Sequence, residues 1–229
     1  MFMKGKLGVL ILDTRFPRLP GDPGNPATYR IPAILKRVEK ATVDKIVAQS
    51  IENEVAELFV NAAKELEKQD ASAITTSCGF LILLQDILPK HVNIPVFTST
   101  LLLVPLAWRL TQKPVGILTA NSKALTAKHL QKAGADNIDV RIRGLEEKPE
   151  FRRVILQDST TMDENLMRRD IVSAAEELAR ENPDIGSVVS ECTNLAPFRN
   201  EIRMVTGRPV FDYHTLVSVI TSSMGGLET

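Results

Sequence analysis

Residues 73–81 read AITTSCGFL, a short apolar run that passes into hydroxyl-bearing residues and then into Cys78. Residues 187–195 read SVVSECTNL and repeat this pattern around Cys192. The β-branched residues predict a buried strand in each segment, and the residues after each cysteine can begin a helix. The two segments therefore predict two strand–turn–helix units, each with a cysteine at the carboxyl end of its strand.

A second pair of similar segments precedes the first pair in the same order. Residues 8–14, GVLILDT, resemble residues 116–122, GILTANS. Cys78 follows Gly8 by 70 residues, and Cys192 follows Gly116 by 76. The shared order and nearly equal spacing indicate that the chain consists of two copies of one unit, which differ by an insertion or deletion.

Strand and helix patterns alternate along the chain. Apolar residues recur at helical spacing from Val55 to Leu66 and from Leu166 to Ala179, and a further helix is expected between an N-cap at Ser122 and Gly134. This alternation favours an α/β fold with parallel sheets. Strands are expected at residues 7–13, 43–47, 73–76, 95–98, 115–119, 138–142, 187–190 and 209–211.

The duplication divides the 229 residues into two lobes. We expect residues 1–108 together with 212–229 to form the lobe that carries Cys78. Residues 109–211 then form the lobe that carries Cys192. In this division the last segment packs back on the first lobe.

Composition narrows the functional class. The chain has 28 basic and 28 acidic residues, so its charge gives no reason to expect nucleic acid or an anionic membrane as a partner. No uncharged apolar run reaches the length of a membrane span, and the N-terminus is interpreted as a first strand and not as a signal peptide. Two cysteines are too few for a disulfide scaffold, so we expect two free thiols and a cytoplasmic protein.

The thiols are the candidate chemistry. A cysteine at a helix N-terminus lies near backbone N–H groups that favour the thiolate, so at least one of the two is expected to have a pKa below the usual value of about 8.5. If the lobes face each other, one thiolate can take a proton from a carbon acid and the other thiol can return a proton to the opposite face. Each cysteine considered alone is more often a small core residue.

At these residues the sequence resembles the aspartate/glutamate/hydantoin racemase superfamily. The resemblance is carried by residues 8–13, by TTSCGF at 75–80 and by ECTNL at 191–195. It implies two flavodoxin-like lobes related by a pseudo-twofold axis, with an interlobe active site that uses no cofactor and no metal. It also implies that Cys78 and Cys192 are the catalytic acid and base. The other implied site residues bind the substrate: Asp13, Thr14, Thr76, Ser77, Gly79, Thr119, Asn121, Thr193 and Asn194.

The resemblance implies an isomerase: a racemase or epimerase, independent of pyridoxal phosphate, that inverts a carbon next to a carboxylate or in a hydantoin ring. Its partner would be a small carboxylate such as aspartate or glutamate. Members of the superfamily are often dimers, but the residues do not decide the oligomeric state of this chain. Asn194 replaces the histidine of glutamate racemases, which disfavours a cell-wall glutamate racemase, and Cys78 argues against the decarboxylase branch. A cysteine-dependent cis–trans isomerase of a small dicarboxylate and a non-catalytic binding protein remain as alternatives.

The loop after the first expected strand is the other unusual segment. Residues 14–32 carry prolines at every third position from 17 to 26, a spacing that favours extended backbone. The loop is interpreted either as a lid, with Arg15, Arg18, Tyr29 or Arg30 reaching a substrate carboxylate, or as a subunit contact. His129 is expected on the surface of its helix, among lysines.

Overall fold

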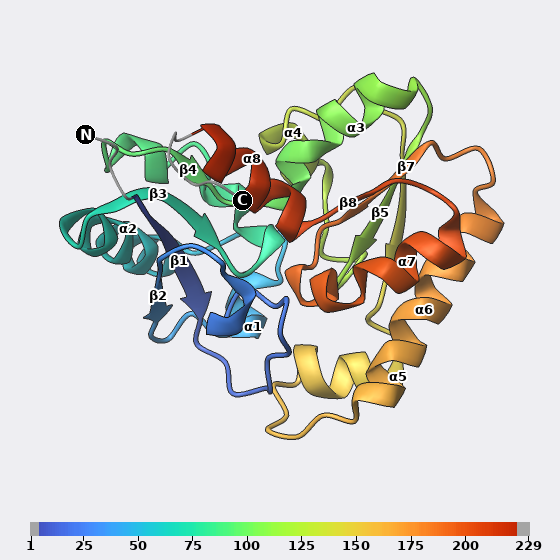
Figure 1. The fold of residues 1–229 in the computed structure, drawn as a ribbon, viewed down its shortest axis with the longest axis horizontal. Helices are drawn as coiled ribbons and strands as arrows, with labels where there is room; N and C mark the ends of the chain where they lie inside the picture. The colour runs from blue at the N-terminus through green and yellow to red at the C-terminus, as the bar shows by residue number, and fades with distance from the viewer. Residues whose placement is uncertain (1–4, 224–229) are drawn as a thin grey trace.

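The computed structural model describes residues 5–223, and these form two four-stranded sheets that lie side by side (Figure 1). The strand order is β2-β1-β3-β4 in the first sheet and β6-β5-β7-β8 in the second, and every pairing is parallel. The same order in both sheets confirms the α/β fold with two lobes. The strands are β1 (Lys6–Leu12), β2 (Ala33–Val38), β3 (Ala71–Thr76), β4 (Val96–Phe97), β5 (Val115–Thr119), β6 (Val140–Gly144), β7 (Ser187–Ser190) and β8 (Val210–Phe211).

The strand register repeats between the lobes. Gly8 of β1 pairs with Ile74 of β3, and Gly116 of β5 pairs with Val188 of β7. Each of these partners lies four residues before a cysteine. A Cβ atom added to Gly8 or Gly116 would lie 3.0 Å from a leucine side chain of the covering helix, so both glycines allow a helix to pack closely on its sheet. The register therefore places the two cysteines at equivalent points of the two lobes.

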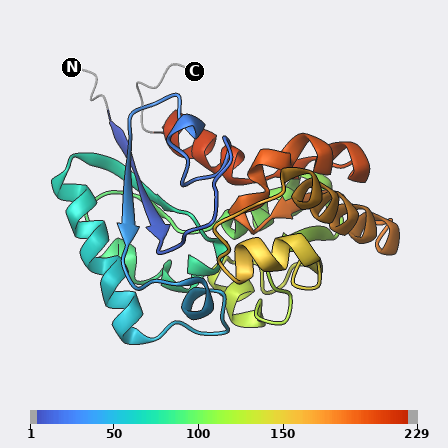
Figure 2. The same ribbon diagram turned by 90° about the horizontal axis from the view of Figure 1, so that it is seen from below.

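Helices cover the sheets and connect their strands. The helices α2 (Asn53–Lys68) and α6 (Glu164–Glu181) occupy the two predicted helical stripes and lie on opposite outer sides of the molecule (Figure 2). The other α-helices are α1 (Val43–Ile46), α3 (Val104–Thr111), α4 (Ala127–Lys132), α5 (Pro149–Phe151), α7 (Arg199–Thr206) and α8 (Tyr213–Ser223). The shorter 3₁₀ and π turns are η1 (Pro26–Thr28), η2 (Gly79–Leu84), η3 (Leu88–Lys90), η4 (Thr100–Leu103), η5 (Arg152–Leu156) and η6 (Thr193–Phe198).

The lobes exchange helices near their junction. Helix α3 packs against β5 and β7 of the second sheet, although it precedes that sheet in sequence (Figure 1). Helix α8 follows the second sheet, yet its Leu216 and Ile220 join Leu7 and Val9 of β1 in one buried cluster. The boundary expected between residues 108 and 109 lies inside α3, and residues 1–4 and 224–229 lie outside the described part, so the exact division stays a prediction.

Several local predictions were wrong. Residues 43–47 form the short helix α1, not a strand, because a buried apolar run of this length does not distinguish the two states. Strand β2 was missed because it is an edge strand whose Lys36 and Arg37 interrupt the apolar pattern. Helix α4 begins after Thr126 and not after Ser122, although Gly134 does adopt the expected left-handed conformation beyond its end.

His129 is buried and not on the surface. Its ring forms a capping box with Thr126 and packs edge-on against Phe80, with ring centroids 5.1 Å apart. Burial lowers the pKa of His129 to about 4, so the imidazole is neutral near pH 7.

Within residues 5–223, no helix has the length and apolar character needed to cross a membrane.

Candidate active site

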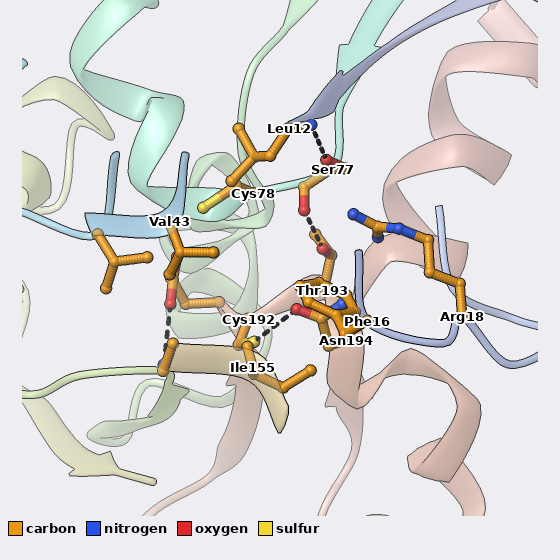
Figure 3. Close-up of a pocket in the computed structure, with 13 residues that line it drawn as sticks. Leu12, Phe16, Arg18, Val43, Ser77, Cys78, Ile155, Cys192, Thr193 and Asn194 are labelled. Carbon is orange, nitrogen blue, oxygen red and sulfur yellow. Dashed lines mark hydrogen bonds between the residues drawn. The ribbon is translucent and has the colours of Figure 1, made fainter. Parts of the chain in front are cut away.

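Cys78 and Cys192 lie at one pocket between the lobes (Figure 3). Each is the residue before a 3₁₀ helix, η2 for Cys78 and η6 for Cys192. Each also lies two residues after an inner strand of its sheet, β3 for Cys78 and β7 for Cys192. The Thr193 hydroxyl donates a hydrogen bond of 2.7 Å to the Ser77 carbonyl oxygen, which joins the two cysteine-bearing turns directly. Both cysteines are free thiols, as predicted.

The pocket is small and mostly apolar. Its free volume is about 20 Å³, which is room for about one water molecule, so a substrate can enter only if the pocket widens. The polar groups at its wall come mainly from the two cysteine-bearing turns. The lining residues are Leu12, Phe16, Arg18, Val43, Val47, Ser77, Cys78, Ala120, Ile155, Glu191, Cys192, Thr193 and Asn194.

The expected lowering of a thiol pKa is wrong for this structure. Backbone N–H groups of Phe80 and Leu81 do act on Cys78 in the expected direction. Desolvation by burial, followed by the negative charge of Glu191, outweighs them and raises the pKa of Cys78 well above its ordinary value. The same two causes raise the pKa of Cys192. The helix N-termini therefore reduce the cost of a thiolate but do not make it the resting state.

The loop of residues 14–32 provides the one cationic side chain of the pocket wall. The Arg18 guanidinium lies 4.6 Å from the Phe16 ring centroid and points toward Ser77 (Figure 3). It is held by Asp22 Oδ1 at 2.6 Å and by the Thr14 hydroxyl at 2.8 Å. Of the four loop residues predicted to reach a substrate, only Arg18 lines the pocket.

The same loop connects the lobes. Asp22 is buried, and its Oδ2 accepts a 2.6 Å hydrogen bond from the Asn194 side chain, two residues after Cys192. Asn194 Oδ1 in turn accepts from the Cys192 thiol at 3.6 Å. Arg15 pairs with Asp158, which follows η5 in the second lobe. The loop thus contributes Phe16 and Arg18 to the pocket wall and, through Asp22 and Asn194, orients one of the thiols.

The structure gathers some of the other predicted site residues and separates the rest. Ser77, Thr193 and Asn194 line the pocket with the cysteines. Four predicted residues lie behind the pocket wall and contact residues that form it. Thr14 accepts a hydrogen bond from Arg18, Thr76 donates to the Cys78 carbonyl oxygen, and both Gly79 and Thr119 lie against Glu191. Asp13 is paired with Arg37, and Asn121 caps the turn before α4, so neither reaches the pocket.

Glu191 is the charged residue of the pocket wall that the sequence did not predict, alongside several apolar lining residues. Its side chain is fully buried, and its Oε2 accepts from the Thr119 hydroxyl at 2.7 Å and from the Ala120 N–H at 3.4 Å. Its Oε1 has no hydrogen-bond partner among residues 5–223. Burial raises the pKa of Glu191 to about 7. The sequence contained a signal only in the position of Glu191, between a buried strand and Cys192.

Sequence similarity to named proteins shows the family of this chain. It is 30% identical over 214 residues to a dimethylsulfoniopropionate lyase of Durusdinium sp. clade D, a match that covers 90% of this chain and 70% of that protein. The chain belongs to the dimethylsulfoniopropionate lyase family. It is also 27% identical to dimethylsulfoniopropionate lyase 3 of Emiliania huxleyi, over 95% of this chain and 59% of that protein. The chain thus spans less than two thirds of some members of the lyase family. No protein-family model matches it.

Solved structures confirm the fold of the racemase superfamily. Unliganded arylmalonate decarboxylase aligns with a TM-score of 0.65 at 16% identity, over 98% of this chain and 94% of that one. An aspartate racemase homologue from Pyrococcus horikoshii aligns with a TM-score of 0.58 at 19% identity, over 96% of this chain and 100% of that one. This chain therefore has the two-lobed fold that the cysteine motifs predicted. Its named relatives by sequence are lyases, which leaves the isomerase class a proposal.

Proposed function

We propose that the protein is a cofactor-independent enzyme that removes the α-proton of a small carboxylate with a cysteine thiolate, and that it completes the reaction by β-elimination from dimethylsulfoniopropionate. The observation that carries this proposal is the meeting of Cys78 and Cys192 at one apolar interlobe pocket with Arg18 in its wall. The apolar side chains suit a leaving group that bears two methyl groups. The names of the relatives favour this substrate.

The elimination is balanced without an added reactant. A thiolate takes a proton from the carbon next to the carboxylate, and the S–H bond forms as the C–H bond breaks. The electron pair moves into a new carbon–carbon double bond while the bond from carbon to sulfonium breaks. The products are acrylate, neutral dimethyl sulfide and a protonated thiol.

The pocket offers a fixed set of groups for the charge that develops on the substrate carboxylate. Arg18 supplies a guanidinium, which can bind a carboxylate with two hydrogen bonds. The N–H groups at the start of η2 and η6 add fixed dipoles that need no rearrangement during the reaction. Asn194 holds the Cys192 thiol and is itself held by Asp22.

Racemisation is the second candidate, because the pocket has two thiols where an elimination needs one base. In a racemase, one cysteine takes the α-proton and the other returns a proton to the opposite face. The substrates would be aspartate, glutamate or a hydantoin. Both reactions begin with the same proton transfer and differ in what the resulting carbanion does next.

Serine variants separate the two candidates. The protein is incubated with dimethylsulfoniopropionate, and dimethyl sulfide in the headspace is measured by gas chromatography. Under the lyase proposal, the wild type forms dimethyl sulfide, either Cys78→Ser or Cys192→Ser loses this activity, and the other variant keeps a measurable part. Release of no dimethyl sulfide, with inversion of an amino acid that both variants lose, would replace the lyase proposal with the racemase. A stable adduct at one cysteine by intact mass would favour the dicarboxylate isomerase, and inertness to every substrate would favour a binding protein.

A further inference from the structure

The buried carboxyl group of Glu191 lies between the two cysteine-bearing turns. Its Oε1 and its own carbonyl oxygen face Gly79, the residue after Cys78, so closely that a Cβ atom at Gly79 would lie 2.3 Å from the first and 2.4 Å from the second. Cys192 is its neighbour in the chain. One carboxyl group thus lies against both cysteine-bearing turns, and the absence of a side chain at Gly79 leaves the space that it fills.

The two oxygen atoms of this carboxyl group differ in their hydrogen bonding. Oε2 accepts hydrogen bonds from Thr119 and Ala120 at the end of β5, whereas Oε1 is buried and has no partner in the part of the chain that the structure describes. A buried, ionised carboxylate with an unpaired oxygen is costly, and such groups either find a partner or hold a proton. Among residues 5–223 no cation pairs with Glu191, and the nearby Arg18 pairs with Asp22 instead.

We propose that Glu191 is a positioning residue that controls the ionisation of both thiols, so that the pocket holds one negative charge either on this carboxyl group or on a cysteine. The charged groups that act on the thiols are Glu191 after β7, and Arg18 and Asp22 of the loop of residues 14–32; an ionised Cys78 also acts on Cys192. Glu191 raises the pKa of both thiols, Arg18 lowers that of Cys78, and Asp22 raises that of Cys192. Of these groups, Glu191 is the one that acts on both thiols, and no cation among residues 5–223 pairs with it.

This proposal rests on the proposed function, because that function needs a cysteine thiolate. The coupling to Glu191 explains how a thiolate can form in a pocket that disfavours it. A protonated Glu191 leaves the site free to carry the charge of a thiolate. An ionised Glu191 opposes it. The physical consequence is a coupling between the carboxyl group and the thiols that exists in the absence of any substrate.

The test is a residue-specific titration of the thiols in Glu191→Gln. The variant keeps the shape of the side chain and removes its charge. The full chain is alkylated with iodoacetamide over a range of pH, and the peptides that contain Cys78 and Cys192 are quantified separately by mass spectrometry. We expect at least one thiol to ionise about one pH unit lower than in the wild type, which is a tenfold larger thiolate fraction on the acid side of the titration. Glu177→Gln, which removes a carboxylate of α6 paired with Lys148, is the matched control and should leave both titrations unchanged.

Unchanged titrations of both thiols in a natively folded Glu191→Gln would overturn the proposal. A second variant covers a Glu191→Gln protein that does not fold. Thr119→Val removes a donor to the Glu191 carboxylate, so the infrared C=O stretch of the protonated carboxyl group, which the wild type should lose near pH 7, should persist to higher pH. The same variant should shift the alkylation titration of at least one thiol, and thiol titrations identical to those of the wild type would contradict the proposal. Neither measurement uses a substrate, so the coupling can hold even if no dimethyl sulfide is formed, and it can fail while the lyase activity stands.

Discussion

At the scale of single residues, the site is determined by what surrounds each thiol more than by the thiols themselves. Cys78 and Cys192 occupy the helix starts that were predicted to favour thiolates, yet burial and Glu191 raise both pKa values. The motifs show where a cysteine stands in its turn. They do not show how far water is excluded from the thiols, because that depends on side chains from distant segments such as Phe16, Val43 and Ile155.

Arg18 should determine the affinity for a carboxylate substrate. Arg18→Lys keeps the charge but loses the planar fork, so we expect kcat/KM to fall about 10- to 100-fold, mainly through KM. Steady-state kinetics with dimethylsulfoniopropionate would measure this. Arg15→Lys is the control, because Arg15 is 66% exposed and does not line the pocket. Equal kinetics in the two variants would remove Arg18 from substrate binding.

Glu191 should also make the protein less stable as the pH rises. Its pKa is about 7 in the folded protein and near the ordinary 4.5 when unfolded. Between these values the folded state keeps a proton that the unfolded state has lost, so the free energy of unfolding falls as the pH rises through this window. Glu191→Gln should remove this dependence and be more stable than the wild type at about pH 8, by about 3 kcal/mol, with a much smaller difference at about pH 4. Urea unfolding at the two pH values is the measurement, and an equal difference at both would contradict the assignment.

At the scale of elements, sequence patterns predicted what local residues determine. Strands β5 and β7 match their predicted ranges because their β-branched, apolar residues are buried on both faces, and α2 and α6 match because their stripes are long. The short segment α1 was mistaken for a strand, and the charged edge strand β2 was missed. Such elements depend on tertiary packing, which a local pattern does not contain.

The loop of residues 14–32 should be held by one buried ion pair. The Arg18–Asp22 pair is nearly buried, whereas in the Arg15–Asp158 pair the arginine is largely exposed. Removal of one partner of a buried pair leaves the other without compensation, and exposed pairs contribute about 0–1 kcal/mol. Asp22→Ala should therefore speed hydrogen exchange throughout the loop, and Arg15→Ala should change it little. Similar exchange in both variants would show that the ion pair does not hold the loop.

At the scale of the whole molecule, the pocket that holds both cysteines forms where two sheets of the same strand order lie side by side. The sequence repeat predicted the two lobes and the pairing of the cysteines, since Gly8 and Gly116 have the same register to their cysteine strands. The exchange of α3 and α8 between the lobes could not be predicted, because the sequence of an amphipathic helix does not say which sheet it covers. The same limit applies to the burial of Glu191, which requires Gly79 from the other lobe.

Helix α8 should be an integral part of the first lobe. Leu216 is buried against β1, while Val219, on the same helix, is 45% exposed. Leu216→Ala should lower the free energy of unfolding by about 2–5 kcal/mol, and Val219→Ala should change it by less than about 0.5 kcal/mol. Thermal or urea unfolding would compare them, and equal effects would mean that α8 does not complete the first lobe.

The central claim is that Cys78 and Cys192 form a site that removes a proton next to a carboxylate, and solvent deuterium tests it most directly. The protein is incubated in D₂O with dimethylsulfoniopropionate, aspartate, glutamate or a hydantoin, and the α-carbon protons and any new olefinic protons are followed by NMR. We predict loss of the α-proton signal from at least one of these substrates, with acrylate as the product from dimethylsulfoniopropionate, and no reaction in the Cys78→Ser/Cys192→Ser double variant. Reaction at the wild-type rate in that double variant, or no reaction of any of these substrates with the folded wild type, would contradict the account.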